Sequence, residues 1–341
     1  MRDIMKFGLL KYTTDNIGDD IQSLAASRFI PVQDYESIYY INREKLNNFY
    51  SPSRIKIILN GWYMYNPKEW PPNECIDPLL ISMHLCQSCN IHKKILSSDG
   101  ISYLKKHGPI GSRDKGTLSI LKEAGIDTYF SGCLTLTLPK FIDVEKKDFI
   151  LLVDAGERVL EFLKTKTKRN IFNLTPCFTF IKTLTTKERF IFAEYILRLY
   201  QSAACVITSR LHAAMPCLAL ETPVLLLNKA KDQYRFEGLK ELVRNSTEKE
   251  YINNYNLFDV NNPPGNFDYY LSYRKTLIHS CEKFMCAPAK KHIDINLRNN
   301  NNVTNESVME IISSKKINNI FTLIAKRKIV EIMTKIKWRF I

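Results

Sequence analysis

Short runs of apolar, often β-branched residues alternate along this chain with segments whose apolar positions recur at helical spacing. The predicted strands are residues 6–12, 37–41, 55–60, 128–138 (as one or two strands), 149–153, 171–174, 205–208 and 223–227. The predicted helices are residues 19–29, 115–124, 157–164, 188–200, 213–220 and 269–285. The helix at 188–200 is expected to open with a capping box of Thr185 and Glu188. Such alternation of strands and helices is typical of parallel sheets covered by helices. We therefore expect an α/β protein.

The length of the chain bounds its domain organisation. Its 341 residues are enough for two domains, and a hydrophobic content of 45% can fill two cores. A charged run at residues 143–148 is the best boundary between the two series of elements. The predicted division is an N-terminal domain over residues 1–146, a C-terminal domain over 147–288, a linker over 289–304 and a basic amphipathic helix over 305–341.

The strand predicted at residues 205–208 leads directly into a turn with two basic residues, Arg210 and His212. Ligands of open parallel sheets bind beyond the carboxyl ends of the strands, beside exposed helix N–H groups, so an anion is the expected ligand. Arginine offers a fork that matches carboxylate or phosphate, and histidine titrates near neutral pH. The structural alternative is that Arg210 only pairs with a carboxylate and His212 only caps a helix.

A second turn of this kind lies between the first strand and the first helix. It contains Asn16, Gly18 and Asp19, and a glycine there allows a ligand to approach the backbone closely. Asp19 also has a structural explanation, because together with Gln22 it resembles a capping box. Both interpretations of Asp19 stay open on the sequence alone.

A third turn contains Arg113. It follows a strand end at Ile110 and precedes the helix predicted at 115–124. Asp114 is expected to cap this helix, which leaves Arg113 able to face a ligand.

Aromatic residues cluster after the strand predicted at 55–60. The segment 61–66 contains Trp62 and two tyrosines, and Trp70 follows closely. We expect a loop over a cleft in which flat rings stack against a sugar. A loop pinned by its own aromatic residues is an equally good interpretation.

Four residues raise the question of a metal or redox site: His84, Cys86, Cys89 and His92. Their spacing lacks the intervening loop that separates the ligand pairs of zinc modules, so chance placement along a strand-to-helix connection is the preferred interpretation. A redox pair at Cys86 and Cys89 is the alternative. We expect no metal, and we expect the nine cysteines to be reduced thiols.

Charge is concentrated at the end of the chain. Residues 315–341 carry eight Lys and Arg side chains against Glu331 alone, which gives this tail +7 of the formal +14. Apolar residues recur there near helical spacing, as in helices that lie on anionic membrane surfaces, although packing against the first domain is the alternative. No signal peptide or membrane span is expected, so the predicted location is cytoplasmic, with the inner membrane face as a working hypothesis.

Three motifs together resemble one family, the polysaccharide pyruvyl transferases. They are residues 16–19 (Asn-Ile-Gly-Asp), residues 108–114 (Gly-Pro-Ile-Gly-Ser-Arg-Asp) with Leu121 and Gly125, and residues 208–212 (Thr-Ser-Arg-Leu-His). The resemblance covers about residues 5–230. The chain departs from the commoner pattern at Ala213, where glycine is frequent, and at Cys133-Leu134, where an Asp-Pro pair is often found.

This resemblance implies two Rossmann-like domains that face each other across a cleft, as in GT-B glycosyltransferases. It implies transfer of pyruvate from phosphoenolpyruvate to a sugar as a cyclic ketal, with the C-terminal domain on the donor side and a glycan as acceptor. The basic tail adds the working hypothesis that this glycan is lipid-linked. The donor is a substrate, and no cofactor is expected. The expected catalytic residues are His212 as general acid and Asp19 as base; the expected substrate contacts are Arg210, Arg113, Asn16, Gly18, Leu211, Ser209 and Trp62.

Two other functions compete with this one. A glycosyltransferase that uses a nucleotide sugar would need an acidic residue for the ribose, and Glu221 is the obvious candidate near the central stretch. The other is a non-catalytic protein that binds a membrane surface through its basic tail. Nucleic acid is not an expected partner, because the basic residues form no recognised binding module and the tail has an aliphatic face.

Overall fold

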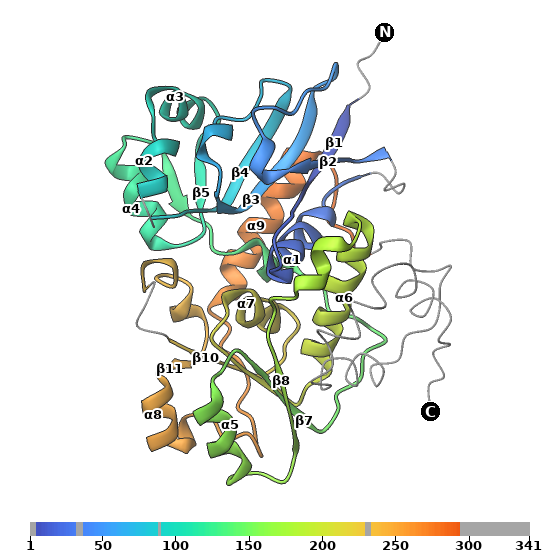
Figure 1. Cartoon of the computed structure of the whole chain (residues 1–341), viewed down its shortest axis with the longest axis vertical. Helices are drawn as coiled ribbons and strands as arrows, with labels where there is room; N and C mark the ends of the chain where they lie inside the picture. The colour runs from blue at the N-terminus through green and yellow to red at the C-terminus, as the bar shows by residue number, and fades with distance from the viewer. Residues whose placement is uncertain (1–4, 32–36, 88–89, 229–232, 294–341) are drawn as a thin grey trace.

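The structure is a computed structural model, and it describes residues 5–31, 37–87, 90–228 and 233–293. These residues form an α/β protein with two sheets, and every pairing between their strands is parallel. The two sheets lie in the upper and lower halves of Figure 1, with helices α1, α6 and α7 between them. The predicted α/β class is thus confirmed, whereas the GT-B-like cleft and the domain boundaries remain predictions.

The first sheet has the strand order β2-β1-β3-β4-β5-β6. Its strands are β1 (Lys6–Lys11), β2 (Tyr39–Asn42), β3 (Ile55–Tyr63), β4 (Ile76–Leu85), β5 (Ile110–Ser112) and β6 (Thr128–Phe130). The second sheet has the order β11-β10-β9-β7-β8. Its strands are β7 (Phe149–Val153), β8 (Asn170–Leu174), β9 (Cys205–Thr208), β10 (Val224–Leu227) and β11 (Asn245–Ser246).

The two sheets share one topology. In each sheet the first strand in sequence, β1 or β7, lies between the second and the third, so that successive connections leave it in opposite directions. Ligands of open parallel sheets bind beyond the carboxyl ends of the strands at this switch point. The turns that follow β1, β7 and β9 are therefore where the fold places a ligand.

Three helices fill the space between the sheets: α1 (Ile17–Ser27), α6 (Thr186–Ser202) and α7 (Leu211–Ala219). Their buried side chains belong to one continuous core that also includes Leu9 of the first sheet and Val206 of the second. Because this core is shared, the two halves are held together by apolar packing. The other helices are α2 (Ile91–Ile95), α3 (Ser98–Lys106), α4 (Lys115–Glu123), α5 (Glu157–Lys164), α8 (Glu248–Asn253) and α9 (Tyr270–Met285).

A buried ion pair joins α1 to α6. Arg189 donates from Nε and Nη2 to the two carboxylate oxygens of Asp20, at 2.9 and 2.7 Å, and both side chains are buried. A further nitrogen of Arg189 donates to the carbonyls of Thr14 and Ile181. This pair fixes the N-terminal end of α1 against the second half of the protein.

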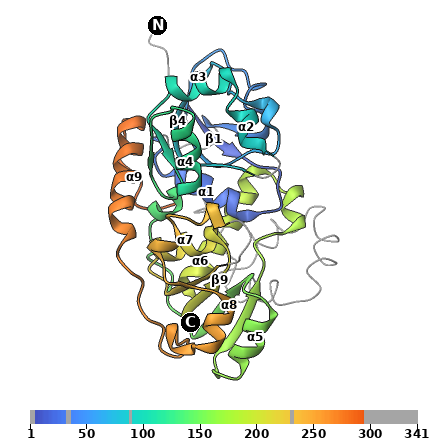
Figure 2. The same ribbon diagram turned by 90° about the vertical axis from the view of Figure 1, so that its left-hand side faces the viewer.

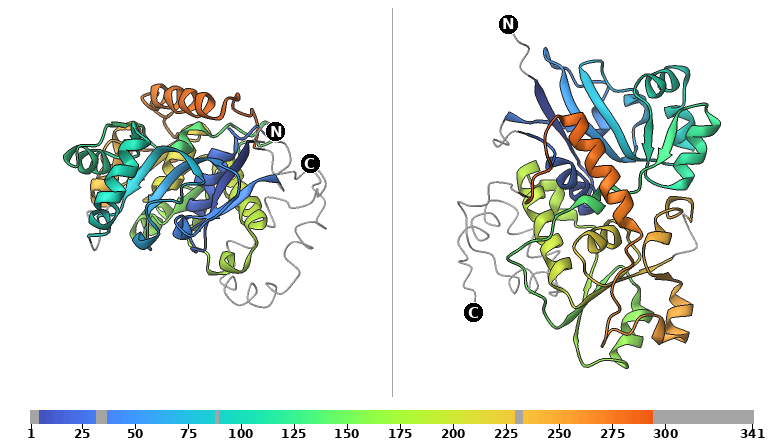
Figure 3. Two further views of the ribbon diagram at one scale, coloured as in Figure 1. Left: turned by 90° about the horizontal axis from the view of Figure 1, so that it is seen from above. Right: turned by 180° about the vertical axis from the view of Figure 1, so that it is seen from behind.

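Helix α9 runs along one side of the molecule beside elements of both halves, as Figure 2 and the right panel of Figure 3 show. The ring of Tyr273 packs edge-on against Phe130 of β6, and Lys56 of β3 lies over the ring of Phe284. Arg274 donates to the carbonyls of Leu138 and Ala219. The helix therefore connects the second half of the chain to the first sheet.

Local sequence signals predicted most elements of the second sheet correctly. Strand β7, helix α5 and strand β9 have the predicted bounds, and α6 begins with the predicted capping box of Thr185 and Glu188. The expected aromatic loop was wrong in part, since β3 continues through Gly61 to Tyr63. This strand extends because Trp62 and Tyr63 pair with β4. The expected second strand within 128–138 is instead a 3₁₀ turn, η5 (Leu134–Thr137).

The described helices include none with the length and apolar character that a membrane span requires. The predicted basic helix over 305–341 and residues 294–304 of the predicted linker lie outside the described residues.

Candidate functional site

The turn after β9 places Arg210 and Ser209 at the switch point of the second sheet. Arg210 precedes α7, and its side chain is 43% exposed. Its Nε donates to Asp154 Oδ2 at 2.5 Å, and Asp154 directly follows the neighbouring strand β7. The hydroxyl of Ser209 donates to the Asp154 carbonyl. Arg210 thus has the carboxylate partner that the structural alternative required, although its side chain stays partly exposed.

His212 lies in the first turn of α7, because this helix begins two residues earlier than predicted. Its Nε2 atom is buried and has no hydrogen-bond partner among the described residues. Burial, followed by the nearby cations Arg113 and Arg235, lowers the pKa of His212 well below its usual range. The imidazole of the protein alone is therefore neutral near pH 7.

Gly18 of α1 lies directly against His212. A Cβ built on Gly18 would lie 2.9 Å from His212 Cβ and 3.0 Å from its Nδ1. Asn16 is the N-cap of α1, and its Oδ1 accepts from the Gly18 N–H at 3.0 Å. The capping box of Asp19 and Gln22, weighed as a structural explanation of Asp19, does not form, since Asn16 is the N-cap of α1. The fold brings the first and third sequence motifs together, with the N-termini of α1 and α7 adjacent.

Arg113 follows β5 and is 1% exposed. None of its three guanidinium nitrogens has a hydrogen-bond partner in the described part of the chain. Its nearest carboxylate, Asp114 Oδ2, lies 3.6 Å from Nε. A buried cation without hydrogen bonds is costly to a protein, so an anionic ligand is the natural partner of this side chain.

Asp114 is held by other groups. As predicted, its Oδ1 caps α4 by accepting from the Thr117 N–H at 2.9 Å. Its Oδ2 lies 2.7 Å from His84 Nδ1, and the His84 ring stacks on Tyr234 with centroids 5.8 Å apart. Burial lowers the pKa of His84 to about 4, which leaves the imidazole neutral as a hydrogen-bond donor to Asp114.

Positive charge therefore gathers at this point of the molecule. Arg113, Arg210 and Arg235 each lower the pKa of His212, and Arg113 and Arg235 also lower that of His84. Sequence reasoning missed His84 in this role, because it grouped His84 with nearby cysteines. It also missed Arg235, which follows β10 in a 3₁₀ turn, η7 (Gln233–Arg235), that no local motif marks.

Asp19 lies one residue beyond Gly18 and is 6% exposed. The Thr14 hydroxyl donates to Asp19 Oδ2 at 2.8 Å, and Arg43 Nη1 lies 3.5 Å from Oδ1. Trp62 is connected to this carboxylate through Arg43, whose guanidinium lies over the Trp62 ring. Arg43 was not predicted from the sequence.

Two of the predicted substrate contacts use their side chains for folding instead. The Leu211 side chain is 3% exposed and belongs to the core, so only its backbone can meet a ligand. The Asn16 side chain is used as the N-cap of α1. The remaining predicted residues form one region that runs from Arg113 and Arg210 across His212 and Gly18 to Asp19.

Metal ligands do not cluster in this region. Within the described residues no group of three or more His, Cys, Asp or Glu side chains could hold a metal ion. Of the four residues weighed as a metal or redox site, Cys89 lies outside the described residues. The eight described cysteines are free thiols.

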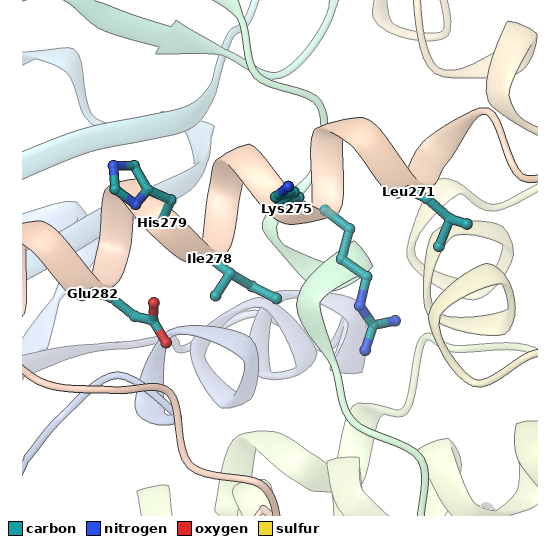
Figure 4. A pocket seen from close by; sticks show the side chains of 6 residues that line it. Leu271, Lys275, Ile278, His279 and Glu282 are labelled. Carbon is teal, nitrogen blue, oxygen red and sulfur yellow. The ribbon is translucent and has the colours of Figure 1, made fainter.

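A hollow of about 370 Å³ lies elsewhere, along the outer face of α9 (Figure 4). Its lining residues are Leu271, Arg274, Lys275, Ile278, His279 and Glu282. None of the predicted site residues lines this hollow, and Arg274 is already bonded to two carbonyls. The buried groups around Arg113 and His212 are the better candidate site, because they are the ones that a ligand would satisfy.

These features describe a two-sheet α/β protein whose sequence motifs meet at a cluster of basic side chains. The sequence model of the polysaccharide pyruvyl transferase family matches residues 16–229, a span that includes Gly18, Arg113 and His212, and the chain belongs to this family of transferases. Comparison with curated proteins gives no match. Among solved structures, the chain is similar to an uncharacterized protein of Klebsiella pneumoniae, with 14% identity, a TM-score of 0.38, and coverage of 68% of this chain and 87% of that one.

Proposed function

We propose that this protein transfers the pyruvyl group of phosphoenolpyruvate to two hydroxyls of one sugar in a polysaccharide precursor, which gives a cyclic ketal and inorganic phosphate. The observation that carries the proposal is the buried guanidinium of Arg113, whose nitrogens have no hydrogen-bond partner in the described part of the chain. Membership of the pyruvyl transferase family supports the same reaction.

The donor has two anionic ends, and the site offers cations for both. Arg113 and the exposed part of Arg210 supply planar forks that match a carboxylate or a phosphate. The N-terminal N–H groups of α1 and α7 lie beside them, because Gly18 is packed on His212. When phosphoenolpyruvate binds here, its oxygen atoms accept hydrogen bonds from the guanidinium nitrogens of Arg113.

The chemistry starts with attack of one sugar hydroxyl on C2 of phosphoenolpyruvate. The C2–C3 double bond takes a proton at C3, and this methylene carbon becomes a methyl group. The C2–O bond to phosphate then breaks, and the second hydroxyl adds to C2 and closes the ketal. Of the two hydroxyl protons, one balances the proton gained at C3 and the other leaves with phosphate.

His212 is the proposed acid that protonates C3, and Asp19 is the proposed base for the attacking hydroxyl. The imidazole is neutral in the protein alone, because burial and its cationic neighbours lower its pKa. An anionic donor placed among those cations cancels part of their effect and raises the pKa of His212 toward neutrality. Donor binding thereby charges the acid that the reaction needs.

The location of the enzyme is part of the proposal. The tail at residues 315–341 has a net charge of +7 and apolar residues near helical spacing. Such a segment suits the anionic inner face of a membrane, where a lipid-linked glycan would be presented as acceptor.

Thermal unfolding tests the donor. A ligand that binds only the folded state raises its melting temperature. We expect phosphoenolpyruvate to stabilise the parent protein, nucleotide sugars to leave it unchanged, and Arg210→Ala to lose the shift. Stabilisation by a nucleotide sugar instead would favour the glycosyltransferase alternative and contradict the proposal.

A further inference from the structure

Three aromatic rings and one arginine form a surface beside Asp19, which we call the aromatic platform; it consists of Tyr12, Arg43, Trp62 and Tyr65. The Arg43 guanidinium lies 4.9, 5.3 and 5.8 Å from the ring centroids of Tyr12, Trp62 and Tyr65. The rings of Trp62 and Tyr65 lie 4.4 Å apart. Tyr65 is 67% exposed and Trp62 is partly exposed, so the platform has a face open to a ligand.

Hydrogen bonds hold the arginine of the platform in place. Arg43 is 1% exposed, and its Nε donates to Glu44 Oε1 at 2.8 Å. The other oxygen of Glu44 accepts from the Asn66 N–H at 2.7 Å, which ties down the segment that carries Tyr65. Glu44 therefore links Arg43 to the segment that carries Tyr65.

One donor of Arg43, Nη1, forms an ion pair but no hydrogen bond within the described part of the chain. Its Nη1 is buried, lies 3.5 Å from Asp19 Oδ1, and has no hydrogen-bond partner among the described residues. Asp19 itself accepts from Thr14 through its other oxygen. An oxygen atom of a ligand that approaches Asp19 can therefore accept from Arg43 at the same time.

The charge balance of the platform differs from that around Arg113. Arg43 is shared by two carboxylates, Asp19 and Glu44, and the nearby carboxylate of Asp15 is paired with Lys182 at 3.2 Å. The platform therefore has no surplus positive charge, whereas the charges of Arg113, Arg210 and Arg235 all act on His212. An anionic ligand on the platform would be repelled by the carboxylates of Asp19 and Glu44.

We propose that the aromatic platform is the acceptor subsite and that it takes an uncharged pyranose, stacked on Trp62 and Tyr65 with one hydroxyl between Asp19 and Arg43. This inference rests on the proposed function, because it assigns the acceptor of that reaction. Asp19 directly follows Gly18, which contacts His212, so the platform begins next to the residues proposed to bind the donor. Arg43 is a positioning residue for Asp19.

Ligand-observed NMR on the full chain, with phosphoenolpyruvate present, tests the subsite. The probes are methyl glycosides of glucose, galactose, mannose and N-acetylglucosamine, with methyl glucuronoside and methyl galacturonoside as anionic partners. We expect saturation transfer to the ring protons of at least one neutral glycoside, with affinity at least about tenfold above that of its uronoside. Equal binding of the uronoside, or no binding of any neutral glycoside, overturns the inference.

Matched variants locate the binding. Tyr65→Ala is expected to lower the affinity for the neutral glycoside about three- to tenfold. Tyr50→Ala removes a tyrosine outside the platform that is 79% exposed, and it should leave this affinity unchanged. Glu44→Gln removes a charge and keeps an acceptor oxygen for only one of its two donors, Arg43 or Asn66, and it should raise the ratio of uronoside to neutral binding about fivefold. An unchanged ratio would count against the charge argument.

The thermal shift with phosphoenolpyruvate separates the two proposals. If Tyr65→Ala and the parent are both stabilised by phosphoenolpyruvate but neutral glycosides do not bind the platform, the acceptor inference alone fails. If phosphoenolpyruvate stabilises neither protein, the proposed function fails first.

Discussion

Gly18 and His212 are in direct contact, and no side chain larger than hydrogen fits between them. The first lies at the N-terminus of α1 beyond the first sheet, and the second lies in the first turn of α7 beyond the second sheet. Because both sheets have the same strand order, this contact joins their two ligand-binding edges. The reactive region is therefore assembled from both halves of the chain.

Gly18→Ala tests that contact. The added Cβ would lie 2.9 Å from His212 Cβ, so α1 or α7 must shift, and we expect a loss of about 1–3 kcal/mol in stability together with weaker phosphoenolpyruvate binding. Gly265→Ala is the matched control, because a Cβ there meets nothing within 4 Å. Chemical denaturation and calorimetry report the two effects; wild-type binding in Gly18→Ala would contradict the role of this contact.

Donor binding should take up a proton. Because His212 is neutral in the protein alone and is proposed to become charged beside an anionic donor, we expect phosphoenolpyruvate to bind more weakly as pH rises from about 6 to 8. Calorimetry in buffers of different ionisation enthalpy measures the uptake, after the donor's own protonation is subtracted. We expect uptake in the parent and none in His212→Gln. Equal uptake in both proteins would show that another group is responsible.

The lowered pKa values also set the acid stability of the protein. In the folded protein the pKa of His84 is about 4, and the pKa of His212 is lowered too. At a pH below the ordinary pKa of histidine, the unfolded chain therefore binds more protons than the folded protein does. Stability is then full above about pH 6.5 and falls as pH drops toward about 4. Urea denaturation across this range should show a shallower fall in His84→Gln. An identical pH dependence in that variant is the contrary result.

The Asp20–Arg189 pair should be important for folding. Arg189→Met leaves a buried carboxylate without its cation, which typically costs about 3–5 kcal/mol, and the double variant with Asp20→Asn should recover part of the loss. Lys164→Ala breaks an exposed pair with Glu161 and serves as control, with no measurable change expected. A small effect of Arg189→Met in denaturant titrations would show that this pair does not lock α1 to α6.

The basic tail can be tested by flotation with liposomes. Full-length protein should float with vesicles that contain anionic lipid, and a chain that ends at Asn305 should remain at the bottom of the gradient. Neutral vesicles are the control. Equal flotation of the two chains with anionic vesicles would exclude the tail as the membrane contact.

The sequence predicted the parts of the fold that local chemistry determines. Thr185 and Glu188 form the capping box of α6 as expected, and Asp114 caps α4. The length of β3 was missed, because Gly61 resembles a turn residue and only pairing with β4 shows that the strand continues. Strand extension of this kind depends on a tertiary neighbour, which no local pattern encodes.

The sequence predicted the motifs of the candidate site but not the residues that contact them in space. Arg113, Arg210 and His212 were recognised because each follows a strand, a pattern that has a physical meaning in parallel sheets. Arg43 was missed because it lies in a 3₁₀ turn after β2, and only the fold brings it to Asp19. His84 was grouped with Cys86 by spacing, whereas its partner in space is Asp114.

Calorimetric titration of phosphoenolpyruvate into the parent protein and into Arg113→Met is the most direct test of the central claim. Arg113 is buried and its nitrogens have no hydrogen-bond partner among the described residues, so methionine should leave the unliganded protein at least as stable. We expect a single site in the parent and an affinity at least about 100-fold lower in Arg113→Met, since two charge-assisted hydrogen bonds are lost. Unchanged binding in the stable Arg113→Met variant, or no binding in the parent, would contradict the account.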